Sequence, residues 1–318
     1  MLSRHFLRSK VLQTIYAGRF EGDDLITLQR QFEYHVGRLS ELGFLQLALL
    51  PKTVEVATSI IEESKKKFRP TEEDRNPRTN FIENTLIRRM TDNFEFKKLN
   101  EKWGGCWETH EDLVREAFLE LRTHKEYKDY AGAHKHDFAD DKQFAILLFR
   151  YLMNREAISA VLSDRSLLWE DDFDQIAQYN YMMLKTIQEN SFDEAMPWPL
   201  MYDKRVEKDE EDMSFARQLL RNTVECREEA EGLIRSHLQG WEFERVSSMD
   251  ILLINMAVAE FVGCPTIPEK VTVDEYIELS KEFSSDRSKL FINGILDKLI
   301  IELRSKGRIN KMGRGLII

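Results

Sequence analysis

The sequence predicts an all-α protein, and composition and periodicity both point to it. Only 14 of the 318 residues are glycine and 7 are proline, about half the usual share. Few turns are therefore available, while Leu, Glu, Lys and Arg favour helices. Apolar residues also recur at helical spacing in one segment after another. At this length, with 42% apolar and 32% charged residues, the chain suits one large or two ordinary soluble domains.

The first helix is expected over residues 4–17, where Leu7, Val11 and Ile15 share one side. Gly18 is expected to end it. A second helix is expected over 24–48, and Pro51 predicts a break before the next one.

The middle of the chain is expected to form a series of short helices separated by polar or aromatic loops. The helical patches lie near 52–67, 79–89, 109–122, 140–163 and 172–190.

The last third shows the clearest helical pattern. Residues 212–238 read as one long amphipathic helix. The segment that begins at a capping Ser247 or Ser248 is almost wholly apolar, as expected of a helix at a domain centre. Another helix is expected over 272–283, starting near Thr272 or Val273.

Asn293-Gly294 is a dipeptide typical of tight hairpin turns, yet its surroundings repeat with the period of a helix. Four apolar residues form one stripe: Phe291, Ile295, Leu299 and Leu303. We predict a helix capped by Ser284 or Ser285 and ended by Gly307. Gly294 then costs about 1 kcal/mol relative to alanine. Either close helix packing or an exposed surface that another molecule approaches closely would explain it.

Charge is distributed unevenly along the chain. The formal net charge is −10, but residues 1–20 and 303–318 contain basic residues and no acid. Both ends are expected to offer local basic surface on an acidic protein. Two alternatives stay open for the N-terminal segment: a merely solvated basic terminus, or a transit peptide.

Three polar residues of the first helix differ in their expected surroundings. Lys10 and Gln13 project away from the apolar arc, whereas Arg8 falls within it. Arg8 is therefore either a ligand-binding residue or a half-buried arginine paired with an acid of another helix.

Several classes of protein are disfavoured. No stretch approaches 18 consecutive apolar residues, so no membrane span is expected. The three cysteines are widely spaced and form no CxxC pair, which suggests neither a disulfide framework nor a zinc site and fits a reducing cytoplasm. No glycine-rich phosphate loop is present. We expect no cofactor, no metal and no enzymatic activity.

Two blocks of sequence resemble the Nus factor B (NusB) family of transcription antitermination factors. The first is "RSKVLQTIYA" (8–17), similar to the family's opening helix. The second is "WEFERVSSMDILLINMAVAEF…IPEKVTVDEYIELSKEFSSDRSKLFINGILDKL" (241–299), which follows the family's order of motifs up to Phe-Val-Asn-Gly-Val-Leu-Asp-Lys. "SFARQLLRNTV" (214–224) looks like the family's central helix.

The resemblance implies an all-α, NusB-like helical bundle with a long helical insertion. Its parts would be N-terminal helices (1–50), an insertion of unknown role (51–205) and the C-terminal half of the bundle (206–318). The family's arginine cluster is thinner here, because His5 and Phe6 stand where arginines often lie.

The resemblance also implies the function and partners of a cytoplasmic antitermination factor. Such a protein binds boxA, a single-stranded element of nascent rRNA, together with a small ribosomal protein that acts as Nus factor E, in the RNA polymerase antitermination complex. The implied RNA-binding residues are Arg4, Arg8, Lys10, Gln13, Asp286, Arg287, Ser288, Phe291 and Asn293. Glu260 would face the protein partner.

Alternatives remain at individual residues and for the whole chain. Phe291 lies on the apolar stripe, so it is either a stacking platform for a base or part of the core. Glu260 is either a partner contact or a simple surface carboxylate. For the chain, the alternatives are a helical scaffold without RNA function and an RNA-binding domain related to RNA cytosine methyltransferases.

Overall fold

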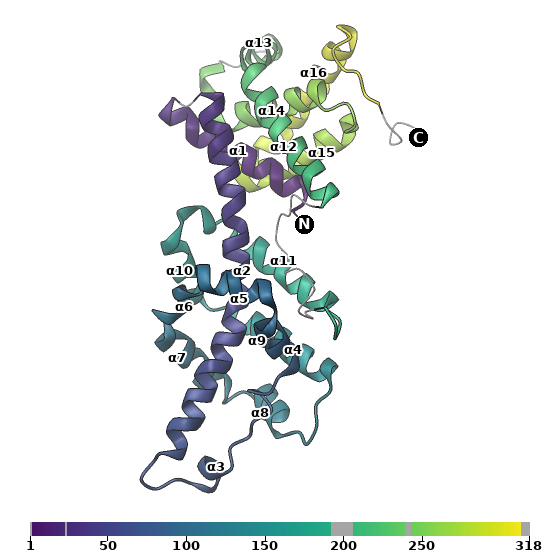
Figure 1. Ribbon diagram of the computed structural model, residues 1–318. Helices are drawn as coiled ribbons and strands as arrows, with labels where there is room; N and C mark the ends of the chain where they lie inside the picture. The colour runs from purple at the N-terminus through teal and green to yellow at the C-terminus, as the bar shows by residue number, and fades with distance from the viewer. Residues whose placement is uncertain (1, 23, 192–205, 239–242, 313–318) are drawn as a thin grey trace. The chain divides into compact units, whose positions relative to one another are not determined.

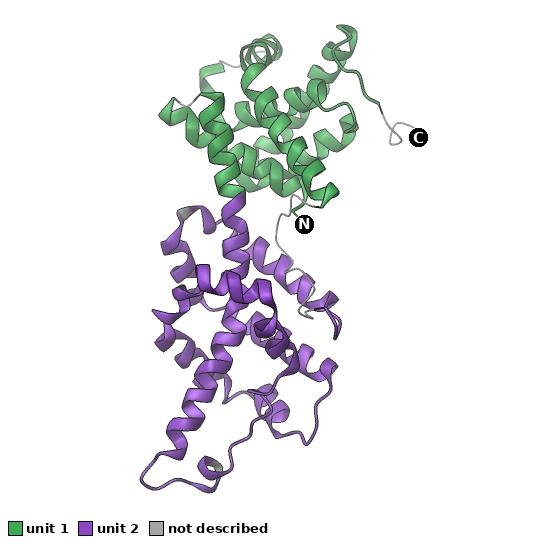
Figure 2. Ribbon diagram, viewed as in Figure 1, with its two compact units in different colours: residues 1–36, 202–318 green, residues 37–201 purple. Residues whose placement is uncertain are grey.

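The computed structural model describes residues 2–22, 24–191, 206–238 and 243–312, and every regular element within these ranges is a helix (Figure 1). The predicted all-α class is thereby confirmed. The chain forms two compact units (Figure 2). Unit 1 comprises residues 1–36 and 202–318, and unit 2 comprises residues 37–201. The sequence placed the corresponding divisions after residues 50 and 205.

Unit 1 is built around one buried helix, α14 (Ser248–Gly263), whose side chains from Asp250 to Phe261 are all buried. Ser247 caps it by accepting a hydrogen bond from the Met249 amide. Other helices of the unit pack on α14; they are α1 (Arg4–Glu21), α12 (Glu207–Glu225), α13 (Arg227–His237), α15 (Glu269–Phe283) and α16 (Ser288–Ser305). A helix surrounded in this way is expected to be apolar on all sides, and α14 is so except for the buried polar residues Asp250, Asn255 and Glu260.

Unit 2 contains a series of shorter helices around the later part of α2 (Leu25–Lys65). They are α3 (Glu72–Arg75), α4 (Thr85–Asp92), α5 (Phe94–Trp103), α6 (Gly105–Glu108), α7 (Glu111–Leu121), α8 (Lys125–Gly132), α9 (Phe138–Met153), α10 (Glu156–Arg165) and α11 (Phe173–Thr186). Trp107 is fully enclosed and donates its indole N–H to the Leu45 carbonyl at 2.8 Å. This bond satisfies the one polar group that Trp107 brings into the core.

The break expected at Pro51 is wrong, because α2 continues through it. Proline in a helix interior costs about 3 kcal/mol. Around it, however, Leu45, Leu49, Leu50 and Val56 are at most 1% exposed, and burying such a side chain stabilises by about 1.5–3 kcal/mol each. Packing on both sides of Pro51 thus outweighs the local penalty.

α2 is also long and apolar enough, by composition alone, to cross a membrane, but 72% of the segment concerned is buried inside the fold. This extent of burial is typical of the core helix of a soluble protein.

Other helix boundaries also differ from the prediction. α1 runs past Gly18 and ends at Gly22, whose φ of 74° is the left-handed conformation that glycine adopts without strain. The helix expected over 212–238 is two helices, divided at Cys226. The segment expected over 140–163 is likewise divided, between α9 and α10. α15 begins at Glu269, directly after Pro268, and not near Thr272. The spacing of apolar residues continues across an interruption of one or two residues, so periodicity alone does not show where one helix ends and the next begins.

Candidate nucleic-acid interface

Arg8 of α1 and Glu260 of α14 form a buried, two-pronged ion pair. Arg8 Nε and Nη2 each lie 2.8 Å from a Glu260 carboxylate oxygen, and the two side chains are 2% and 0% exposed. Burial alone would lower the pKa of Arg8, but the hydrogen bond and the charge of Glu260 raise it above its ordinary value. This is the paired arginine that the sequence left as an alternative, and the pair connects α1 to the central helix.

Polar groups of α15 complete the surroundings of this carboxylate. Thr272 Oγ1 donates to Glu260 at 2.8 Å, and the Tyr276 hydroxyl donates at 3.3 Å. Burial, followed by the negative charge of Glu260, raises the pKa of Tyr276 well above its ordinary value. Because Glu260 is enclosed, the alternative of a simple surface carboxylate is wrong.

Lys10, expected to project away from the apolar arc of α1, is only 3% exposed and does not reach solvent. Its Nζ donates to Gln13 Oε1 at 2.6 Å and lies 5.2 Å from the centre of the Phe6 ring. The first part of α2 lies nearby: burial, and then the charge of Lys10, lower the pKa of His35. Helical periodicity showed which side of α1 is apolar, but it did not show that the first part of α2 lies near Lys10. Gln13 is half-buried.

Arg4 and His5 lie at the other end of α1, and both contact acids. Arg4 Nε is 2.6 Å from Asp212 of α12, and the Arg4 side chain stays 37% exposed. The imidazole of His5 lies between Glu275 and Glu282, at 2.8 and 3.0 Å. The hydrogen bond to Glu275 is the main cause that raises the pKa of His5 to about 9.

The segment before α16 is held by Asp250, in the first turn of α14. The hydroxyls of Ser284 and Ser288 donate to the two Asp250 oxygens at 2.5 and 2.9 Å. The expected capping role of Ser284 or Ser285 is wrong: α16 begins at Ser288, with Arg287 at its N-cap and no side-chain cap. Ser284 instead binds an acid of another helix, a long-range contact that the local pattern does not reveal, while Ser285 contacts Ser288.

Asp286 and Arg287 are exposed at this start of α16, while Ser288 is buried against Asp250. The end of α1 reaches the same turn of α14, since Arg19 Nη1 donates to the Ser248 carbonyl at 3.2 Å. Next to it, the Phe20 ring is 76% exposed. The end of α1 and the start of α16 thus both contact the first turn of α14, at Ser248 and at Asp250 respectively. The sequence counted Arg19 only as part of a basic terminus and did not single out Phe20.

Asn293 and Gly294 lie within α16, so the prediction of a helix through this dipeptide is confirmed. Ile292, Ile295 and Leu296 are buried, Phe291 and Asn293 are half-buried, and Gly294 is exposed. A Cβ built on Gly294 would meet nothing within 4 Å. Packing within the described chain thus gives no reason for a glycine here, and the backbone of α16 is open to an approaching molecule.

An acidic groove of about 890 Å³ lies along α12 and the loop after α14. Its lining includes Glu207, Glu210 and Glu211, with Arg4 and Phe215. The Phe215 ring also lies beneath the guanidinium of Arg8, at 4.9 Å. The groove is thus adjacent to the buried ion pair that holds α1 in place.

The described residues contain no group of three or more His, Cys, Asp or Glu side chains that could hold a metal ion. The features of unit 1 are those of a binding surface: an exposed aromatic, amides, an open helix backbone and an acidic groove.

Comparison with known proteins places the similarity in the second half of the chain. The model of the NusB family matches residues 173–300. The transcription antitermination protein NusB of Salinibacter ruber is 40% identical over 112 residues, which is 35% of this chain and 70% of that protein. No solved structure matches the chain.

Two further relatives, also named transcription antitermination protein NusB, match smaller shares of their length. That of Chloroherpeton thalassium is 35% identical over 103 residues, 32% of this chain and 49% of that protein. That of Symbiobacterium thermophilum is 41% identical over 92 residues, 29% of this chain and 60% of that protein. In both cases, the chain spans less than two thirds of the relative's own length.

Proposed function

This chain belongs to the NusB family, and on that premise we propose that it is a cytoplasmic transcription antitermination factor that binds boxA-type single-stranded RNA. In this proposal it acts together with the small ribosomal protein that serves as Nus factor E, within the RNA polymerase antitermination complex. NusB proteins are antitermination factors and not enzymes, so family membership confirms the expectation of a non-enzymatic protein.

The open backbone at Gly294 is the observation that carries the RNA-binding proposal. A glycine in an exposed helix interior costs about 1 kcal/mol, and no neighbour in the described chain requires it. Half-buried Phe291 and Asn293 flank it. A base splayed out of a single strand stacks on an aromatic ring and is read by amides at its edges. We assign stacking to Phe291 and base reading to Asn293 and Gln13.

The charged candidates, together with Ser288, divide into two groups by exposure. Arg4, Asp286 and Arg287 reach solvent, and we assign them direct contacts with the RNA. Arg8, Lys10 and Ser288 are at most 3% exposed, and we assign them the positioning of α1 and α16. We add Arg19 and the exposed Phe20 to this surface, because Arg19 contacts the same first turn of α14 that holds the start of α16.

The acidic groove along α12 fits a basic partner. Ribosomal proteins are basic because they bind rRNA phosphates, and an acidic surface attracts them and speeds their association. Glu260 is buried beneath this region and pairs with Arg8. We therefore propose that Glu260 supports the partner surface by holding α1 in place.

Titration of a fluorescent rRNA-leader oligonucleotide tests the proposal, with and without the ribosomal partner and at two salt concentrations. We expect salt-dependent binding that the partner strengthens. Phe291→Ala should weaken it by about 1–3 kcal/mol, the usual loss when a stacking ring is removed.

Leu290→Ala is the matched control, because Leu290 is the 75% exposed neighbour of Phe291 on the same helix. Salt-independent or undetectable binding, with the fold intact by circular dichroism, would favour a helical scaffold without RNA function. Equal affinity of Phe291→Ala and the unmodified chain would remove the stacking role.

A further inference from the structure

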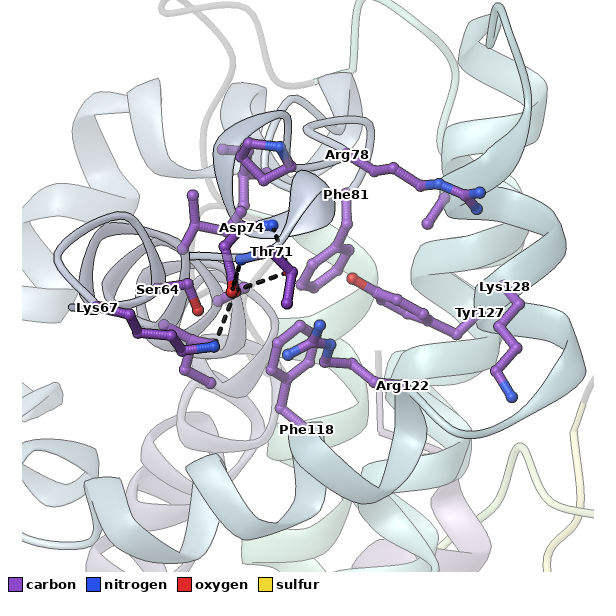
Figure 3. A pocket seen from close by; sticks show the side chains of 16 residues that line it. Ser64, Lys67, Thr71, Asp74, Arg78, Phe81, Phe118, Arg122, Tyr127 and Lys128 are labelled. Atoms are coloured by element: carbon purple, nitrogen blue, oxygen red, sulfur yellow. Dashed lines mark hydrogen bonds and ion pairs between the residues drawn. The ribbon is translucent and has the colours of Figure 1, made fainter. Parts of the chain in front are cut away.

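A cavity of about 380 Å³ lies in unit 2, and none of its lining residues is assigned to RNA or partner binding above. It is enclosed by the end of α2, the segment from Thr71 to Ile82, and helices α7 and α8 (Figure 3). Its volume is within the range of sites that bind small molecules, about 300–1,000 Å³.

Three aromatic rings form the apolar part of the cavity. Phe81 and Phe118 are stacked, with centroids 5.3 Å apart. Tyr127 stands edge-on to both, at 5.9 and 5.6 Å. Phe81 and Phe118 are at most 2% exposed, whereas Tyr127 is half-buried. Phe81 and Phe118 thus form a buried wall, and Tyr127 is the ring that a flat group can reach.

Basic side chains surround this wall. Figure 3 shows Lys67, Arg78, Arg122 and Lys128 around the three rings. The one carboxylate among the lining residues is Asp74, which accepts hydrogen bonds from Lys67 at 2.8 Å and from Thr71. The bond from Lys67 is the main cause that holds the pKa of Asp74 well below its usual range. Asp74 therefore offsets Lys67 and leaves the other three cations in excess.

Those three cations have no partner within the described part of the chain. Arg78, Arg122 and Lys128 are exposed, and their side chains form no hydrogen bond or ion pair with a described residue. Arg69, Arg75 and Arg88 of unit 2 are likewise exposed and have no ion pair with a described residue, so the distinguishing feature of Arg78, Arg122 and Lys128 is that they line one cavity. In a chain with a net charge of −10, three unpaired cations around one cavity indicate an anionic ligand.

The backbone of α8 also leaves room for one of these cations. A Cβ built on Gly132 would lie 2.7 Å from Arg78 Nη1. Glycine at this position therefore lets the guanidinium of Arg78 lie close against α8.

We propose that this cavity is a binding site for a nucleotide, with the base against Tyr127 at the open edge of the aromatic wall and the phosphate attracted by the positive charge of Arg78, Arg122 and Lys128. The planar guanidinium of arginine matches phosphate oxygens two at a time, and every base offers a flat face to an aromatic ring. A free nucleotide and a nucleotide of an RNA strand share this chemistry. The site lies in a different unit from the proposed boxA surface and is independent of it.

Calorimetric titration of the full chain with AMP, GMP, CMP and UMP tests the site, with adenosine and inorganic phosphate as the two halves of the ligand. We expect at least one mononucleotide to bind about tenfold or more tightly than either half. Arg78→Gln or Arg122→Gln should weaken that binding about tenfold, the usual effect of losing a hydrogen bond to a charged group. Lys98→Gln removes the same charge from exposed α5 of the same unit and should change nothing.

A short adenylate oligonucleotide distinguishes the two sources. Tighter, Arg122-sensitive binding than that of AMP assigns the site to an RNA strand, and weaker binding assigns it to a free nucleotide. Failure of all four mononucleotides to bind, or equal binding by the arginine variants, would overturn the proposal. So would tighter binding of an acidic, phenylalanine-containing peptide. The proposed function is tested separately, by the effect of Phe291→Ala on affinity for the rRNA-leader RNA. Loss of nucleotide binding with that effect intact would overturn only the site in unit 2.

Discussion

At the scale of single residues, burial decides which charged side chains can meet a partner. Arg8, Lys10 and Glu260 have the chemistry of RNA- or partner-binding residues, yet none is more than 3% exposed. Arg8 and Glu260 hold one another, and Lys10 is bonded to Gln13. In the proposed function, these three residues therefore act by fixing the position of α1.

The ion pair between Arg8 and Glu260 leads to a stability prediction. Glu260→Gln should lower the free energy of unfolding by about 3 kcal/mol, because the buried guanidinium of Arg8 then keeps only the half-buried Glu275, at 3.4 Å, as a counter-charge. Urea denaturation measures this loss. Replacing both partners with apolar residues, as Arg8→Met with Glu260→Leu, should destabilise less than Glu260→Gln alone. A larger loss in the double variant would contradict this account.

His5 leads to a prediction on pH. Its pKa is about 9 in the folded chain, against an ordinary value of 6.5 for an unperturbed histidine, so its pairing with Glu275 and Glu282 stabilises fully below pH 6.5. The stabilisation is lost as pH rises through about 9. His5→Gln should lower the free energy of unfolding by about 1 kcal/mol at pH 6, a value reduced for solvent screening, and by almost nothing at pH 10.

Urea denaturation of both proteins at these two pH values measures the difference. His134→Gln, at an exposed position of unit 2, is the control and should show no such dependence. An equal effect of His5→Gln at both pH values would mean that the carboxylates do not hold the imidazolium.

At the scale of elements, α16 combines a strong helical period with a glycine that its own packing does not need. Buried Ile292, Leu296 and Leu299 hold the helix against its neighbours, so the local preference of Asn-Gly for a turn is overridden. The exposed side of the same helix bears Gly294, and the stability lost there is consistent with a surface kept open for binding.

Substitution of this glycine should separate stability from binding. Gly294→Ala should raise the free energy of unfolding by about 0.5–1 kcal/mol, because the added methyl meets nothing and alanine favours helix. Gly294→Leu should weaken binding of the rRNA-leader RNA. Gly232 of α13 also has open space at its Cβ, so Gly232→Ala should stabilise equally and leave binding unchanged. Full RNA affinity in Gly294→Leu would show that the glycine is incidental.

At the scale of the whole molecule, the net charge of −10 opposes RNA at long range. In the proposed function, RNA affinity therefore depends on a few local cations and on a basic partner. Arg287→Gln removes one such cation from the start of α16 and should reduce the slope of log affinity against log salt by about one. Fluorescence anisotropy over a salt series measures the slope. Lys98→Gln in unit 2 should leave it unchanged, and an unaltered slope in Arg287→Gln would exclude a phosphate contact there.

Most of the architecture followed from local pattern. Periodicity predicted α1, the buried α14 and the helix through Asn293-Gly294, because apolar residues recur every three to four positions along the buried side of a helix. The boundaries were less predictable where a long-range contact replaces a local cap, as when Ser284 and Ser288 bind Asp250.

By itself, the sequence determined that the chain is all-α, that it is similar to NusB and that Gly294 lies within a helix. Only the tertiary structure decided which of the candidate residues reach solvent, that α2 continues through Pro51, and that three cations surround an aromatic cavity in unit 2. The physical reason is that the period of a helix reports which side is apolar, whereas exposure and ion pairing depend on elements distant in the chain.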